Sequence, residues 1–220
     1  MIGESEALLD VAEPMRRDAS ISANGQYRWS LHREWRRHDQ APRWVTFVML
    51  NPSTADADLD DPTIRRCIGF ARALDATGLA VVNLYALRAT QPADLWKATD
   101  PVGPSNDHHL AMFLAMAQAH DFPIIAAWGA HAKPDRVATV LAMPGAERLQ
   151  ALHVTKNGAP GHPLYLPATS VPRPWPARNV PPARSSEACR HRWVTDFGGP
   201  TEECLGCGAL VPQPAGLVDG

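Results

Sequence analysis

The chain has 220 residues, of which 45% are hydrophobic and 20% charged, and this globular composition allows one domain plus a small appendage. Its formal net charge of −2 excludes a chain that is basic throughout, so any contact with nucleic acid must come from local patches. No apolar run approaches the roughly 18 residues of a transmembrane helix, and the acidic N-terminus does not resemble a signal peptide. We therefore expect no membrane contact and a cytoplasmic location.

The N-terminal part changes character at Gln26. Residues 1–25 are acidic and weakly patterned, which predicts a loose extension. From Gln26, aromatic or apolar residues alternate with polar ones, as in an edge strand. A basic stretch overlaps this segment, and it is either a solvated hairpin, the commoner outcome for a charged run, or a phosphate contact. Its arginines are Arg28, Arg33, Arg36, Arg37 and Arg43.

A uniformly apolar run, Trp44–Leu50, predicts a buried parallel strand. It stops at the polar turn Asn51–Thr54. Asp61 is then a predicted N-cap with Pro62 at the first helical position, and Gly78 is expected to stop the helix.

The same alternation of strand and helix continues to Leu166. Further strands are predicted at 79–84, 123–128 and 149–154, with helices at 92–98, 109–120 and 134–143. Four strand–helix repeats predict parallel strands joined by right-handed crossovers. We therefore expect an α/β core domain over 26–167, a three-layer sandwich with a four-stranded, mostly parallel sheet.

Polar, Gly- and Pro-rich turns follow all four predicted strands. Because parallel strands end at the same edge of a sheet, these turns are expected to converge on one ligand pocket. Each also has a structural interpretation as a turn former, packing residue or satisfied edge residue. The candidate pocket residues are Asn51, Pro52, Ser53, Thr54, Asn83, Tyr85, Arg88, Trp128, Gly129, His131 and His162.

The aspartates after the first strand have two interpretations. Asp58, Asp60 and Asp61 supply the oxygen ligands that Mg²⁺ prefers, but such a run is more often a solvated loop with one helix cap. The phosphate-binding glycine motifs and the G-x-S-x-G nucleophile elbow are both missing from the sequence.

The C-terminal part begins with a Pro- and Arg-rich segment, 168–187, that predicts an extended linker. Residues 188–212 then contain Cys189-x-His191 and Cys204-x-x-Cys207, a spacing that suits one tetrahedral zinc ion. A unit this short cannot bury a core of its own, so a structural zinc would supply its folding energy. The segment resembles the zinc-ribbon knuckles of phage and bacterial proteins.

The core resembles a bacterial and phage family catalogued as a domain of unknown function, number 1643. The segments YRWSL, FVMLNPSTADADLDDPTIRRCIGFA, VVNLYALRAT and TKNGAPGHPLYL carry this similarity over residues 27–166. It implies membership of the family and no activity.

A looser similarity is to the uracil-DNA glycosylase superfamily. Leu50-Asn51-Pro52-Ser53, Asn83, Trp128-Gly129 and His162-Pro163-Leu164 follow in the order of its motifs. The resemblance implies that Asn51 places the attacking water, Asn83 reads a base edge and His162 stabilises the departing base, with no metal at the pocket. It differs in having Ser53 in place of the motif's glycine.

Three functions therefore remain open. The favoured one is a glycosylase-like hydrolase acting on a base in nucleic acid or a nucleotide, with basic residues, including Arg173, Arg178 and Arg184 of the linker, meeting phosphates. The alternatives are a non-catalytic module that binds a nucleotide or modified base, and a Mg²⁺-dependent phosphohydrolase. The sequence leaves the oligomeric state open.

Overall fold

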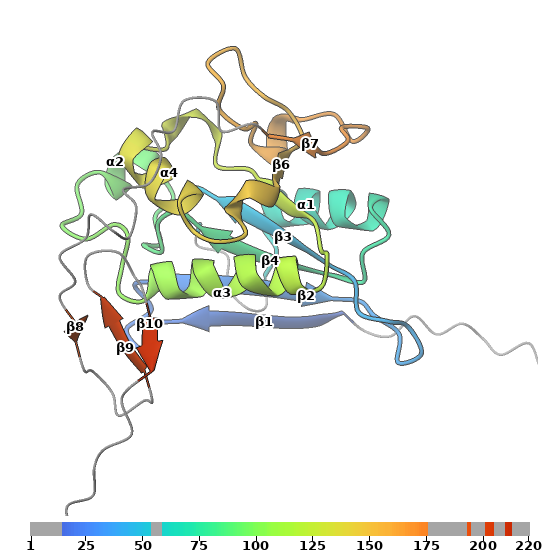
Figure 1. Ribbon diagram of the computed structural model, residues 1–220. Coiled ribbons are helices and arrows are strands. Elements are labelled where there is room, and N and C mark those ends of the chain that lie inside the picture. The colour runs from blue at the N-terminus through green and yellow to red at the C-terminus, as the bar shows by residue number, and fades with distance from the viewer. Residues whose placement is uncertain (1–14, 54–58, 176–192, 195–200, 205–209, 213–220) are drawn as a thin grey trace, which may run out of the picture. The chain divides into compact units, whose positions relative to one another are not determined.

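The computed structural model describes residues 15–53, 59–175, 193–194, 201–204 and 210–212 (Figure 1). The chain divides into two compact units, Met1–Asn179 and Val180–Gly220.

A seven-stranded mixed sheet forms the centre of the first unit, in the spatial order β1-β2-β4-β3-β5-β6-β7. The four central strands β4, β3, β5 and β6 are parallel, whereas β1, β2 and β7 are antiparallel to their neighbours. The prediction of parallel strands was correct for this centre, but the predicted total of four strands was wrong. The strands are β1 (Arg16–Ile21), β2 (Arg28–Glu34), β3 (Trp44–Met49), β4 (Gly78–Asn83), β5 (Ile124–Ala126), β6 (Leu149–Ala151) and β7 (Arg173–Pro174).

The three additional antiparallel pairings correct three expectations at the ends of the core. Residues 16–21 form β1 and are not part of a loose extension. Because β1 covers β2, the strand that begins at Arg28 is internal to the sheet and not an edge. At the other end, β7 pairs with β6, so residues 173–174 belong to the sheet and not to a linker.

The four predicted helices are present, and each has at least one boundary that differs from the prediction. The α-helices are α1 (Pro62–Ala73), α2 (Pro92–Leu95), α3 (Asn106–Ala119) and α4 (Pro134–Leu141), and the short 3₁₀ helices are η1 (Gly129–His131), η2 (Ala146–Arg148) and η3 (Pro163–Tyr165). Asp61 caps α1 and Pro62 is its first residue, as predicted. The helix ends at Ala73, however, two residues before Asp75, which has a left-handed conformation. Gly78 therefore does not stop the helix, contrary to the prediction, but is the first residue of β4.

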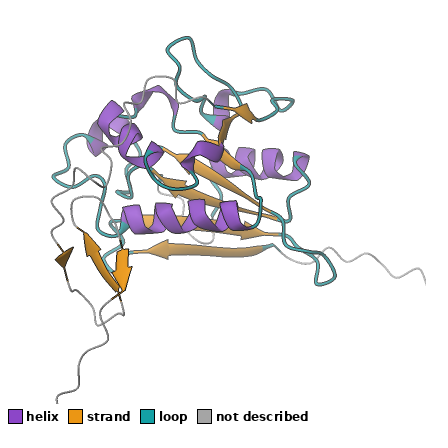
Figure 2. Cartoon of the chain, viewed as in Figure 1, coloured by secondary structure: helices purple, strands orange, loops and turns teal. Residues whose placement is uncertain are grey.

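Helices cover both faces of the sheet (Figures 1 and 2). Val45 and Phe47 of β3 pack with residues of α1 on one face, and Val48 packs with residues of α3 on the other. Successive strand residues face opposite sides of a sheet, so a central strand buried on both sides must be apolar throughout. This requirement explains the uniform hydrophobicity of Trp44–Leu50.

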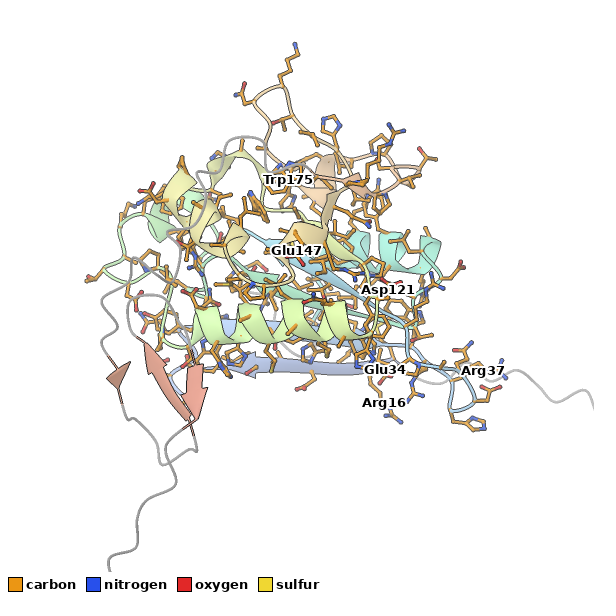
Figure 3. All side chains as sticks on the ribbon, in the orientation of Figure 1. Arg16, Glu34, Arg37, Asp121, Glu147 and Trp175 are labelled. Carbon is orange, nitrogen blue, oxygen red and sulfur yellow. The ribbon has the colours of Figure 1, made fainter. Side chains whose placement is uncertain are left out.

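The basic stretch is solvated only in part, at Arg37 and Arg43, and it forms no hairpin because β4 lies between β2 and β3. Arg28 is 2% exposed and Arg33 is fully buried. Arg36 lies beyond β2 and forms an ion pair with Glu34 at 2.9 Å. Arg37 lies in the connection from β2 to β3, well to one side of the sheet (Figure 3). That connection leads into the amino end of β3, so Arg37 lies at the sheet edge opposite the carboxyl ends of the parallel strands.

The second unit contains a three-stranded antiparallel sheet in the order β10-β9-β8. Its strands are β8 (Trp193–Val194), β9 (Thr201–Cys204) and β10 (Leu210–Pro212). Of the four predicted zinc ligands, Cys204 is the last residue of β9, and Cys189, His191 and Cys207 lie outside the described residues. Among the described residues, the helices are all too short or too polar to cross a lipid bilayer.

Candidate functional site

A cavity of about 740 Å³ opens at the carboxyl ends of the parallel strands. Residues that follow each of the four strands line it, together with the first turn of α1. The predicted residues that it brings together are Asn51, Ser53, Asn83, Trp128, Gly129, His131 and His162. The convergence of four polar turns at this edge follows from the parallel pairing of the strands.

Asn83, the last residue of β4, lies in the wall of the cavity with only 1% of its surface exposed. Within the described part of the chain, neither its Nδ2 nor its Oδ1 has a hydrogen-bond partner. A buried polar atom without a partner costs about 1–3 kcal/mol. The amide therefore has an unused donor group and an unused acceptor, side by side, at a residue of the cavity wall.

Asn51 has a different environment. Its Nδ2 donates hydrogen bonds to the carbonyl oxygens of Ala89, at 2.7 Å, and Pro52, at 3.0 Å. Both amide protons are thus used to join the turn after β3 to the segment after β4. The Oδ1 atom accepts no hydrogen bond from any described residue, so it is available to orient a water or a ligand donor.

His162 lies in the segment after β6, directly before η3. Burial lowers the pKa of its imidazole, and the charge of Asp61 partly opposes this effect. Its Nδ1 accepts a hydrogen bond from the backbone N–H of Leu164. In a neutral ring whose Nδ1 accepts, the proton is on Nε2. The neutral side chain therefore has an N–H donor available for a ligand.

The turn after β5 brings the backbone close to His162. Gly129 has a φ of +71°, a conformation that favours glycine, and a Cβ placed there would lie 3.8 Å from the Cβ of His162. The preceding Trp128 is 3% exposed and packs edge-to-face against Trp175, with ring centroids 5.1 Å apart. The tryptophan supports the wall of the cavity and does not present a free ring face to solvent.

Three candidate residues are not part of the lining, and a fourth is not described. Tyr85 is 2% exposed, packs against Trp96, and its hydroxyl oxygen accepts a hydrogen bond from the backbone N–H of Lys133. Arg88 donates from Nη1 to the carbonyl oxygen of Gly25. Pro52 lies next to the lining without belonging to it. Thr54 is outside the described residues.

The cavity also contains residues to which the sequence interpretation gave no place in the pocket. Arg28 reaches it because β2 has an irregularity: Ser20 pairs with Ser30 and Ile21 with Arg28, which leaves Trp29 as an extra residue. Such bulges turn the neighbouring side chain to the other face. Others are Asp61, Thr63, Gln91, His153, Thr155 and Tyr165. Only Arg28 and Asp61 had a signal in the sequence, as a basic residue and a helix cap.

Two aspartates of the predicted magnesium site, Asp60 and Asp61, have other partners, and the third, Asp58, lies outside the described residues. Asp60 binds Arg33 at 2.7 Å and Arg17 at 2.8 Å. Asp61 caps α1 through the N–H of Ile64. The structure brings together no group of three or more potential metal ligands within the residues it describes.

Comparison with known proteins identifies a family and no activity. No curated protein matches the chain. A family model described as "Protein of unknown function (DUF1643)" matches residues 28–164, a range that begins in β2 and includes Asn51, Asn83 and His162. Because this range covers more than half of the sequence, the chain belongs to the DUF1643 family.

Proposed function

We propose that the cavity binds a nucleobase and that the protein hydrolyses the N-glycosidic bond of that base, in nucleic acid or in a nucleotide. The observation that carries the proposal is the buried, unpartnered amide of Asn83 in the cavity wall. Nucleobases present a donor and an acceptor on adjacent atoms, and an amide matches such an edge with two hydrogen bonds.

Two further residues support hydrolysis at this site. The glycosidic transition state resembles an oxocarbenium ion, so water placement and stabilisation of the leaving base are the main tasks. Asn51 has a fixed amide whose free atom is an acceptor suited to hold a water molecule. The Nε2–H group of neutral His162 is suited to donate to the departing base anion.

The order of these residues along the chain supports a layout like that of uracil-DNA glycosylases. Asn51 follows β3, Asn83 ends β4, Trp128-Gly129 follows β5 and His162 follows β6. The pairing of Asp60 with two arginines, and the capping role of Asp61, favour hydrolysis without a pocket metal over a magnesium-dependent phosphohydrolase.

The second unit supports a separate zinc proposal. Trp193 of β8 pairs with Cys204, the last residue of β9. Cys207 belongs to the connection from β9 to β10. The spacing of Cys189-x-His191 and Cys204-x-x-Cys207 suits the four ligands of one tetrahedral structural zinc ion. We propose that these residues hold one zinc ion.

Hydrolysis is tested by incubating the protein with oligonucleotides and nucleotides that carry normal and modified bases. The expected products are abasic sites, detected by alkaline cleavage, and free base, detected by chromatography. Asn51→Ala should abolish product formation while the protein still binds the base. Binding without product over the whole set would support the non-catalytic module instead, and absence of binding would overturn both.

A further inference from the structure

Asp61 has a position that a helix cap alone does not require. Its Oδ1 accepts the hydrogen bond from Ile64 that caps α1, at 2.8 Å, yet the residue also lines the cavity. The similarity to the glycosylases assigns it no role, because their motif ends with the turn after the first strand.

The second carboxylate oxygen of Asp61 also has a hydrogen-bond partner, and this partner lines the cavity. Oδ2 accepts a hydrogen bond of 2.5 Å from the hydroxyl of Ser53, which itself lines the cavity two residues after Asn51. Short bonds of this kind are typical of a charged acceptor. Each carboxylate oxygen has two lone-pair sites, so both oxygens can accept one further hydrogen bond.

The carboxylate also lies near the group proposed to stabilise the leaving base. The negative charge of Asp61 acts on the imidazole of His162 and opposes part of the effect of burial. Asp61, Asn51 and His162 thus line one cavity, in whose wall the amide of Asn83 has no hydrogen-bond partner among the described residues. A water that Asn51 orients would have a proton acceptor at hand.

We propose that Asp61 is the general base of the hydrolysis, an inference that rests on the proposed function. A proton of the water passes to the Asp61 carboxylate while the water oxygen forms a bond to C1′ of the sugar. The C1′–N bond breaks, its electron pair stays on the base nitrogen, and the Nε2–H of His162 stabilises the resulting anion. The step changes no oxidation state, and the negative carboxylate also stabilises the oxocarbenium character of the transition state.

The capping and catalytic roles of Asp61 can be separated, because asparagine caps helices as well as aspartate does. Asp61→Asn keeps the shape and a capping oxygen but removes the charge. We expect its Tm to stay within about 2 °C of the wild type, whereas kcat falls by about 10²–10⁴-fold and KM changes little. Asp61→Ala removes the cap too, and its Tm should fall by about 3 °C.

A matched control is Asp121→Asn. Asp121 is 90% exposed, lies in the connection from α3 to β5 and has a left-handed conformation that asparagine tolerates (Figure 3). This variant should keep the wild-type kcat.

The outcomes distinguish this inference from the proposed function. If the wild type releases base and Asp61→Asn retains its kcat, Asp61 is only a helix cap and the inference is wrong, while the hydrolysis stands. If the wild type binds bases but releases none, both proposals are wrong. A large loss of kcat in Asp61→Asn with an unchanged Tm supports the general base.

Discussion

Arg33 and Asp60 form a buried ion pair, in which Nε of the fully buried guanidinium lies 2.7 Å from Oδ1 of a carboxylate that is only 10% exposed. The pair joins β2 to the segment before α1. Asp60 also binds Arg17 of β1 at 2.8 Å. The two arginines thus fix the entry to the helix whose first turn lines the cavity.

Removing the carboxylate of this pair should destabilise the protein strongly. Asp60→Ala removes from the buried guanidinium of Arg33 the carboxylate that lies 2.7 Å away, which should lower the free energy of unfolding by about 3 kcal/mol. Arg17→Ala is the control, since its side chain is 35% exposed, and should cost less than about 1 kcal/mol. Urea denaturation measures both, and equal losses would contradict the assignment of the pair.

Asn83→Leu should separate stability from binding. The substitution removes two buried polar atoms that have no partner within the described residues, so the free energy of unfolding should stay level or rise by about 1 kcal/mol. The two lost ligand contacts should weaken binding of a nucleobase by roughly 10–100-fold. Denaturation and calorimetric titration with nucleosides measure the two effects.

Asn106→Leu is the matched control for Asn83. Asn106 is equally buried, but its Nδ2 donates to the carbonyl oxygens of Asn83 and Leu84. Its replacement should lower stability by about 1–3 kcal/mol. A loss of similar size in Asn83→Leu would mean that the Asn83 amide has a structural role.

Local pattern was sufficient to predict the central sheet and most of the helices. Continuous apolar runs such as Trp44–Leu50 can be buried only between two covered faces, and Asp61-Pro62 is a strong helix start. The antiparallel strands were harder to predict. Residues 16–21 and 173–174 are mostly exposed and are strands because they pair with β2 and β6, which is a tertiary effect with no periodic signal.

The lining of the cavity was also predictable only in part, because some of its residues reach it through strand pairing that has no local signal in the sequence. Polar residues at the ends of parallel strands must converge, which accounts for Asn51, Asn83 and His162. Arg28 reaches the cavity through an irregularity in β2 that depends on the pairing with β1. Tyr85 was misplaced because it lies beyond the end of β4, where strand alternation no longer sets the direction of a side chain, and its ring packs against Trp96 in the core.

The stability of the protein should fall as the solution becomes acidic. Burial lowers the pKa values of His32, His109 and His162 from the ordinary 6.5. The folded protein therefore binds fewer protons than the unfolded chain below that pH, so stability is lost as the pH falls. His32→Leu should make the decline from about pH 7 to 5.5 shallower, as measured by denaturation at each pH. An unchanged slope would contradict this.

The zinc proposal predicts about one zinc ion per chain, since four ligands complete one tetrahedral site. The double variant Cys204→Ser, Cys207→Ser should lose the metal. Cys67→Ser is a suitable control because Cys67 belongs to α1 and is fully buried in the core of the first unit. Elemental analysis of the purified proteins measures the zinc, and full retention in the double variant would disprove the site.

Trp175 should contribute to the stability of the first unit although it lies within the segment 168–187 that was predicted as a linker. Its ring packs against Trp128, its indole N–H donates to the carbonyl oxygen of Gly158, and it lies at the end of β7 (Figure 3). Trp175→Ala should lower the free energy of unfolding by about 2 kcal/mol and weaken ligand binding, because Trp128 lines the cavity. Val171→Ala, at a residue that is 65% exposed, should change neither. If both variants unfold at the same urea concentration as the wild type, the core ends before Trp175.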